Sequence, residues 1–520
     1  MNAAPARLVL SRLRRQPGAR PATRRPIGAA AARTALIALL LSACTMAPVY
    51  QRPALPVAPA YPGAATAETT TTAATAAAET AAAPAAALGW RDFLADPRLA
   101  RLIELALANN RDLRIAALNI DLARAQYQIQ GAPLLPNLTA GASDARQRTP
   151  APLRVPGEPA VLSVYGASVG LTSYELDFFG RVRSLRDAAL ASYLASEQAR
   201  RSAQISLVAQ VADAYLTLLA DGEQVELTRK TLASREEAYR IAQLQFQAGT
   251  LSALDLRQSE TLVRSAQADL ASQSRARAQA ENALTLLLGQ PVPEDLPAPR
   301  ALAEQALADD LPVGLPSELL QRRPDLLAAE QQLQAQNASI GAARAAFFPR
   351  ITLTGNDGFT SIQLSGLFHG SARSWSFTPA ISLPIFDGGV LRADLAASKV
   401  QRDIAVAAYE KAVQTAFREV ADGLAARGTF VQQLAAQDAL VRAEEARLAL
   451  ARLRYEKGVA SSLDVLDAER ELFSAQQTLI AVRLARLTNL VDLYKAIGGG
   501  WSERRAPDTA AAEVPGRPSP

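Results

Sequence analysis

The sequence has almost none of the residues on which metal sites, disulfides and many catalytic sites depend. Its 520 residues include one cysteine, Cys44, and one histidine, His369. A single cysteine cannot form an internal disulfide, and one distant histidine cannot complete a zinc motif with it. No nucleophile with a base partner, metal cluster or pair of catalytic acids is recognisable elsewhere. We therefore predict that the protein is not an enzyme and has no metal or soluble cofactor.

The excess of basic charge is confined to residues 1–43. This segment has eight arginines, no lysine and no acidic residue, and it ends with an apolar run, 35–41, followed by Ser42 and Ala43. Such an order is typical of a bacterial secretory signal, and the apolar run is too short to span a bilayer as a helix. Without this segment 47 basic residues remain against 50 acidic ones. The charge therefore gives no reason to predict nucleic-acid binding.

Cys44 directly follows this segment. The sequence Leu41-Ser42-Ala43-Cys44 resembles the lipobox of bacterial lipoproteins, in which the cysteine receives a diacylglyceryl group and becomes the new N-terminus. This resemblance implies a covalent lipid on Cys44, and Thr45, which is not aspartate, favours the outer membrane. An ordinary cleaved signal with a chance cysteine is the alternative.

Long apolar runs are also missing after Cys44. No uninterrupted stretch of 18 apolar residues occurs there, so a membrane crossing would have to be made of strands. Residues 44–89 are rich in proline, then in alanine and threonine, and we interpret them as an acylated tether. The folded body is predicted to begin near Trp90, and residues 501–520 are predicted to be a disordered tail.

The body is internally duplicated. "QFQAGTLSALDL" (245–256) matches "RYEKGVASSLDV" (454–465) at an offset of 209, and other matches follow in the same order. A period this long exceeds that of solenoid repeats. We predict a first structural repeat over 90–290, a linker at mid-height over 291–316, and a second repeat over 317–500.

Each repeat is expected to contain a helix, two strands, a very long helix and a returning helix. Apolar residues alternate with small or polar ones from Trp375 to Ile385, which indicates a strand with two unlike faces. Strands are predicted near 137–147, 163–177, 350–360 and 373–386, with a longer hairpin loop in the first repeat.

The long helices are predicted from two proline-free runs, 181–247 and 390–456. At 1.5 Å per residue, each would be about 100 Å long. Turns follow at 248–254 and 457–462. The chain is expected to return through two separate helices, 254–288 and 317–346, which together have a similar length.

Four strands are too few to close a barrel, and an open sheet edge in lipid leaves backbone groups unpaired. Several copies must therefore share one barrel. Two copies would give eight strands, and three would give twelve, which leaves room for a passage. The small residues on one strand face favour three copies.

Several segments in order carry a family resemblance: "CTMAPVYQRP", "PLLPNLTAG", "FFPRITLTG", "YELDFFGRVR", "LPIFDGGVLRADLAAS", "AFREVADGLAARGTF", "SLDVLDAERELFSAQQ" and "LYKAIGGGW". They resemble the TolC family of outer-membrane efflux channels, and most closely its lipoprotein branch typified by OprM. The resemblance covers roughly 90–501 and the N-terminal anchor.

This resemblance implies a mainly α fold with a β-barrel portion. It implies a homotrimer with a 12-stranded transmembrane β-barrel, continued by a long α-helical periplasmic barrel. The expected function is a passive conduit for drugs or other small solutes in a tripartite efflux system. Its partners would be a periplasmic adaptor, an inner-membrane pump of the RND type and outer-membrane lipid, and its location the bacterial outer membrane, lipid-anchored.

Two other functions stay open. The outer-membrane duct of a type I protein secretion system would have the same architecture, although such ducts usually lack the lipid anchor. A soluble periplasmic coiled-coil protein would share the helices, but the alternating strands and the duplication argue against it.

The resemblance places a periplasmic iris gate at the turns that end the long helices. The matching positions are Leu463, Asp464, Asp467, Arg470, Tyr455 and Asp255. Positions 463, 467 and 470 share one helix face. Three copies around an axis would make rings of carboxylates, and the family's lipoprotein branch often lacks an acid at the site of Asp464. Asp464 can equally cap the restarted helix.

Overall fold

A computed structural model describes residues 45–61, 88–157, 159–305, 307, 308, 311 and 316–501. The predicted signal segment, Cys44 and most of the predicted tail lie outside the described residues. What the sequence predicts for them therefore stays a prediction.

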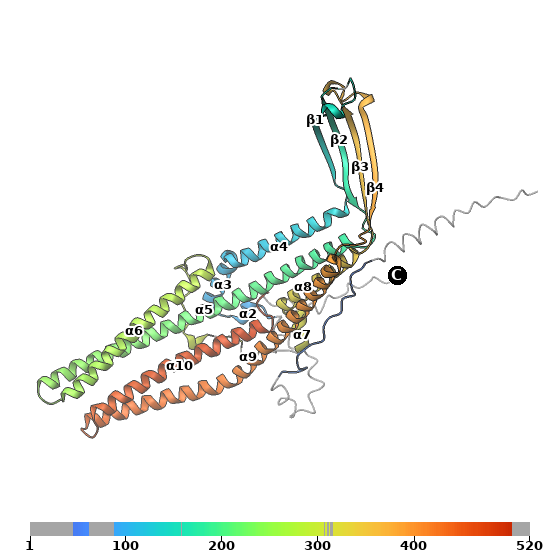
Figure 1. Ribbon diagram of the computed structural model, residues 1–520. Coiled ribbons are helices and arrows are strands. Elements are labelled where there is room, and N and C mark those ends of the chain that lie inside the picture. The colour runs from blue at the N-terminus through green and yellow to red at the C-terminus, as the bar shows by residue number, and fades with distance from the viewer. Residues whose placement is uncertain are drawn as a thin grey trace, which may run out of the picture. The chain divides into compact units, whose positions relative to one another are not determined.

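Each repeat contains a broken helix, a strand hairpin, a long helix and a returning helix (Figure 1). The first repeat consists of α2 (Trp90–Phe93), α3 (Pro97–Asn109), α4 (Arg111–Gly131), β1 (Leu138–Arg148), β2 (Val161–Glu175), α5 (Arg181–Gln247) and α6 (Ala253–Leu288). The second consists of α7 (Pro316–Arg322), α8 (Pro324–Ala345), β3 (Arg350–Ser361), β4 (Arg373–Ser382), α9 (Val390–Glu456) and α10 (Ser462–Ala496). This order agrees with the predicted duplication.

The two long helices, α5 and α9, begin and end where the sequence predicts. Each has 67 residues and follows a glycine in the left-handed region, Gly180 with φ 74° and Gly389 with φ 94°. Asp177 and Asp387, which precede these glycines, accept hydrogen bonds from backbone N–H groups of the first turn. The start of each long helix is therefore specified locally, by glycine conformation and an acidic cap.

The predicted helix 317–346 is wrong in one respect, because the structure divides it into α7 and α8. The break lies at Arg323, directly before Pro324. Proline lacks the N–H that a helix interior requires, so it begins a new helix. The first repeat breaks at the corresponding place, between α3 and α4. A glycine packs against each break. A Cβ added to Gly289 would lie 2.5 Å from the Asn109 carbonyl oxygen in the first repeat, and a Cβ added to Gly498 would lie 2.9 Å from the Arg322 carbonyl oxygen in the second.

The strands form one antiparallel sheet in the order β1-β2-β3-β4. The prediction of a longer loop in the first hairpin is wrong, because loops 149–160 and 362–372 are nearly equal. The extra residues lie in β2, which has 15 residues against 10 in β4 and contains a bulge between Leu171 and Tyr174. β4 ends at Ser382 and not at 386, since Pro384 cannot continue the ladder.

The helices pack around one main core. Helix α5 lies against α3, α4, α6, α8 and α10. Within the described residues, α5 alone is long and apolar enough to cross a membrane, and half of its most apolar window is buried inside the protein. Since the core helix of a soluble protein meets the same criterion, we treat α5 as part of the helical body.

A buried polar cluster ties the linker to this core. The Asp96 carboxylate accepts hydrogen bonds from the Tyr215 hydroxyl and the Gln305 amide, both at 3.0 Å. Leu302 N–H donates to Glu223 on α5 at 2.7 Å. These contacts hold the linker against α5 between the strand end and the far turn, which agrees with its predicted place at mid-height.

The predicted tether is wrong for its first part, because residues 46–61 are packed against the helical body. Arg52 donates two hydrogen bonds of 2.8 Å to the Glu330 carboxylate on α8, and the Tyr50 hydroxyl donates a third at 3.0 Å. Asn337 and Arg344 of α8 donate to the carbonyls of Pro48 and Met46. We call residues 46–61 the N-terminal strap. Its proline-rich sequence gave no sign of these contacts, since their partners lie almost 300 residues away.

Candidate functional site

The two helical hairpins turn in the same way at the ends of α5 and α9. Gly249 has φ 74° and Gly458 has φ 69°. In each turn the third residue after the helix donates to a carbonyl five residues back, Thr250 to Gln245 and Val459 to Arg454, both at 2.9 Å. This is the Schellman motif, in which glycine takes the left-handed position. Figure 1 shows both turns at the opposite end of the long helices from the strands.

Both returning helices begin with a polar cap. The Ser252 hydroxyl accepts a hydrogen bond from Asp255 N–H at 3.1 Å. At α10, the Ser461 side chain and the Asp464 side chain form a reciprocal capping box, with Ser461 N–H donating to Asp464 at 3.1 Å. Such caps stabilise a helix by about 1 kcal/mol. The capping role of Asp464 is therefore observed, and its role in a gate stays a prediction.

Asp255 joins the two turns. Its Oδ1 accepts the Ser462 hydroxyl at 3.1 Å, and its Oδ2 accepts the Ser252 hydroxyl at 2.7 Å. The carboxylate therefore receives one hydroxyl from each hairpin. The sequence comparison had paired Asp255 with Asp464 as equivalent positions, but it gave no sign that one turn bonds to the other.

A cavity of about 180 Å³ lies between the two hairpins next to this contact. Asp255 and Tyr455 both line it, so the structure brings these two predicted residues together. Leu463 lies outside the lining and is 53% exposed. The remaining lining residues are Ala238, Ile241, Ala242, Gln245, Leu251, Ser259, Ser462, Val465, Leu466 and Glu469.

Asp467 lies between two arginines. Its carboxylate contacts Arg447 of α9 at 2.5 Å and Arg470, one turn along α10, at 2.6 Å. The hydrogen bond to Asp467 raises the pKa of the Arg447 guanidinium, with a further contribution from Glu444. Asp467 and Arg470, two of the three positions that the sequence places on one helix face, form an ion pair with each other. Arg447 was missed, because nothing in the spacing along α9 reveals a partner on α10.

This pairing changes the expected electrostatics of the turn. A ring built from Asp467 alone would present bare carboxylates, whereas here each carboxylate pairs with two guanidinium groups, which also pair with Glu444 and Glu471. Arg452 likewise pairs with Glu469 at 2.7 Å. The Asp467 cluster therefore cross-links α9 to α10, and Asp464, occupied by its cap, is the other acid of the turn.

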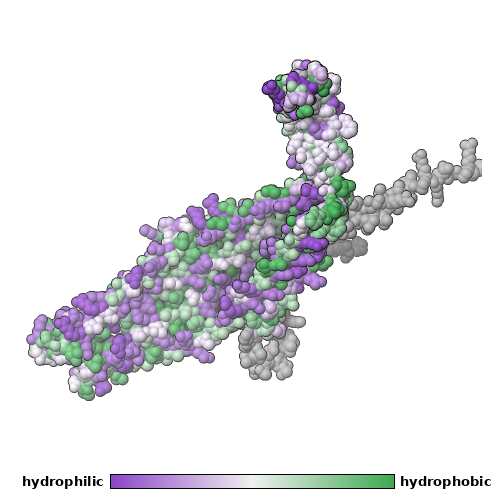
Figure 2. Space-filling model, in the orientation of Figure 1, coloured by the Kyte–Doolittle hydropathy of each residue, from purple (hydrophilic) through white to green (hydrophobic). Residues whose placement is uncertain are grey.

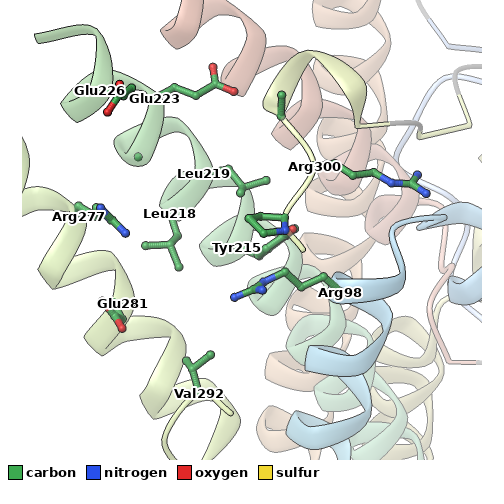
Figure 3. A pocket seen from close by; sticks show the side chains of 13 residues that line it. Arg98, Tyr215, Leu218, Leu219, Glu223, Glu226, Arg277, Glu281, Val292 and Arg300 are labelled. Carbon is green, nitrogen blue, oxygen red and sulfur yellow. The ribbon is translucent and has the colours of Figure 1, made fainter. Parts of the chain in front are cut away.

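A larger cavity, about 490 Å³, lies higher along α5, where α6 and the linker meet it. Figure 3 shows Glu223 and Glu226 of α5 and Arg277 and Glu281 of α6 around it, together with Tyr215 and Arg98. Its charges are mixed and none of the predicted site residues lines it. Among the described residues no group of three His, Cys, Asp or Glu side chains is placed to hold a metal ion.

Comparison with known proteins agrees with this architecture. The sequence pattern of the family described as "Outer membrane efflux protein" matches residues 102–290 and 315–499. The chain belongs to this family. The chain is 50% identical over 484 residues to the antibiotic efflux pump outer membrane protein ArpC of Pseudomonas putida and to the toluene efflux pump outer membrane protein TtgC of the same species, covering 92% of this chain and 98% of each relative.

A solved structure gives the same result. The open state of the MtrE outer membrane channel of Neisseria gonorrhoeae has 42% identity and a TM-score of 0.78, covering 89% of this chain and all of that one. The predicted family and the TolC-like fold are thereby confirmed. Membership of a family of efflux channels also supports the prediction that the chain is not an enzyme. The lipid on Cys44 and the gate residues are not tested by these comparisons.

Proposed function

We propose that the protein is the outer-membrane duct of a tripartite efflux system and works as a homotrimer. The observation that carries this proposal is a four-stranded sheet with two open edges, in a chain of the outer membrane efflux family. β1 and β4 each have one unpaired side. Pairing β4 of each copy with β1 of the next removes every edge, and three copies give a barrel of twelve strands.

One face of the sheet is suited to a passage. Cross-strand partners share a face, so the register assigns Thr139, Ser143, Ser168, Thr354, Ser376 and their neighbours to a single side. On this side lie alternate residues of each strand, counted from 139 to 147, 162 to 170, 352 to 360 and 374 to 382. All of them are uncharged, and most are Gly, Ala, Ser or Thr. We call this side the lumen face and the other, which includes Trp375 and Phe377, the lipid face.

The helices also have apolar surface that no other described part of the chain covers. Ile115, Leu118, Leu122 and Ile129 of α4 are between 55% and 66% exposed. Their spacing of three, four and seven places them on one side of the helix. On α9, Val400 and Ile404 are 56% and 62% exposed. Association of three copies would bury these stripes.

The descriptions of the relatives indicate which solutes the protein is expected to export. The two relatives are described as parts of pumps for antibiotics and for toluene. We propose apolar small molecules of these classes as cargo, with a periplasmic adaptor and an inner-membrane pump as partners. We also propose that Cys44 carries the lipid. The N-terminal strap that follows is fixed to α8, where Arg344 binds the carbonyl of Met46.

The turns are the proposed gate. Leu463 is an exposed apolar side chain at the tip of the second hairpin, and in a trimer three copies would narrow the mouth. In the shut state the ion pair of Asp467 with Arg447 joins α10 to α9, and Arg470 of α10 holds the same carboxylate. Opening would require an adaptor to compete for these groups.

Conductance of the purified protein in planar bilayers tests the duct. We expect trimers that pass ions, and a stable monomer that passes none would overturn the proposal. For the gate, Leu463→Ala is compared with Leu254→Ala, which occupies the equivalent position of the first repeat and is also exposed, at 68%. We expect more frequent opening in the first variant only. Equal behaviour of the two would reject Leu463 as the constriction.

A further inference from the structure

The lipid face of the sheet changes character along the strands. Three adjacent rows of cross-strand partners are Leu138–Leu171–Gly355–Phe377, Ala140–Val169–Asp357–Trp375 and Ala142–Ala167–Phe359–Arg373. Further rows toward the loops contain Asp144 with Tyr165, then Arg146 with Ser163, then Arg148 with Val161. In the other direction, toward the helices, the rows contain Leu353 with Pro379 and then Ile351 with Ile381. Charge is therefore confined to the loop half of this face.

The position of these charges matches the edge of a membrane. From Ile351 to Asp357, where charge begins, the strand rises by about 20 Å at 3.4 Å per residue, and a tilt of about 40° reduces this height to roughly 16 Å. The row that contains Asp144 and Tyr165 lies about 10 Å higher, at roughly 26 Å. A barrel's apolar band is about 25 Å tall. Tyr165, Phe359 and Trp375 lie in the rows where charge begins, as aromatic residues do at an interface. Figure 2 shows hydrophilic residues gathered at the loop end of the strands, above a paler stretch.

Basic side chains outnumber acidic ones in this region. Arg146 pairs with Asp144 and Arg373 pairs with Asp357, both at 3.0 Å. Arg148 has no ion pair among the described residues. We call these five residues the arginine belt: Asp144, Arg146, Arg148, Asp357 and Arg373. The belt has a net charge of +1 in each chain, and its two paired arginines are 63% and 64% exposed.

We propose that the arginine belt binds the phosphate groups of a phosphorylated glycolipid in the outer leaflet. This inference rests on the proposed trimeric barrel, because closure puts the lipid face outward. Closure also brings β1 of one copy next to β4 of another, so that Arg146 and Arg148 lie on the strand beside the one that carries Arg373. Guanidinium groups bind phosphate in a bidentate manner. A headgroup at this seam would meet arginines of two neighbouring copies.

The alternatives differ in what they predict. If the arginines only reach into water, retained lipid will not depend on their charge. If they attract any anion, a glycerophospholipid will serve as well as a glycolipid. A specific site for phosphorylated glycolipid will prefer that lipid and will depend on both its phosphates and the arginines.

The experiment uses the full-length trimer in detergent with equal amounts of diphosphorylated lipid A and phosphatidylglycerol, and native mass spectrometry counts the bound lipids. We expect preferential retention of lipid A, which falls about fivefold for each arginine lost in Arg148→Gln and Arg373→Gln. Lipid A without its phosphates should be retained no better by the parent than by these variants. Arg402→Gln and Arg418→Gln on α9 are the matched controls and should change nothing.

A second pair of variants gives an effect of opposite sign. Asp144→Asn and Asp357→Asn increase the positive charge of the belt and should increase retention of lipid A, so a defect in folding cannot imitate the result. Equal retention in the parent and both pairs of variants would overturn the inference, as would equal retention of phosphatidylglycerol by the parent. A conducting trimer that shows either result refutes only the belt, whereas absence of a conducting trimer refutes the proposed function.

Discussion

Asp213 is a carboxyl group whose burial should make the helical body less stable as pH rises. It lies on α5, and its Oδ1 is buried without a hydrogen-bond partner in the part of the chain that the structure describes. Burial and, to a smaller extent, nearby Asp492 raise its pKa to about 7, and Lys495 opposes this shift. Both neighbours lie on α10. The folded protein therefore holds a proton at Asp213 that the unfolded chain releases near pH 4.

The sign and size of the effect follow from proton linkage. Between about pH 4 and 7 the folded state binds more protons than the unfolded state, so the free energy of unfolding falls as pH rises through this range. A shift of about three pKa units corresponds to at most about 4 kcal/mol. Asparagine has nearly the same shape and no charge. Asp213→Asn should therefore stabilise the protein at pH 8 and change little at pH 4.

The assay is thermal unfolding of the purified protein, followed by circular dichroism at 222 nm between pH 4 and 8. Unfolding entropy scales with chain length, so the full effect would raise Tm by about 4 °C at pH 8. Asp422→Asn is the matched control, because Asp422 is the equivalent residue of the second repeat and is 75% exposed. If Asp213→Asn shows the same Tm difference from the parent at pH 4 and pH 8, or if Asp422→Asn does as much, the reasoning fails.

Three further changes test other contacts. In Gly358→Ala, the new Cβ would lie 2.3 Å from the Ala167 carbonyl, so we expect less heat-resistant trimer on gels, whereas Gly141→Ala, with nothing within 4 Å, should be normal. Glu330→Gln removes the charge that holds Arg52, and limited proteolysis should then cut the N-terminal strap several times faster; unchanged cleavage would mean that the strap is held by other contacts. Ser461→Ala removes half of the capping box and should cost about 1 kcal/mol, which hydrogen exchange of the first turn of α10 would detect as faster exchange.

The parts that the sequence predicts well are those specified by neighbouring residues. The bounds of α5 and α9 agree to the residue, because a proline-free run between glycines leaves the helix few places to end. The turns at Gly249 and Gly458 were found in the same way. Alternation located all four strands, although Pro384 ended β4 earlier than its pattern suggested.

The remaining features depend on contacts between distant segments. Nothing near Arg52 indicates Glu330, and nothing near Asp467 indicates Arg447, because each partner is brought close only when helices pack. The break between α7 and α8 does not depend on distant contacts, because Pro324 is a local signal for it. The prediction missed this signal because the residues on both sides favour a helix. Asp464 shows how far prediction from the sequence extends. Its capping role rests on a local contact, which the structure shows, whereas a ring of carboxylates around an axis depends on other copies of the chain.

The two hairpin tips are alike in backbone and unlike in charge. At the offset of the repeat, Ala238, Gln258 and Thr261 stand where the second tip has Arg447, Asp467 and Arg470. Three copies would place six hairpins around the axis, related by a pseudo-sixfold rotation of their glycine turns. The ion pair between Asp467 and Arg447, which joins two helices, would occur at every other tip, so that the true symmetry is only threefold. A protein that docks against this end would meet two non-equivalent sites, one in which an ion pair joins the two helices and one in which the ion pairs stay within single helices.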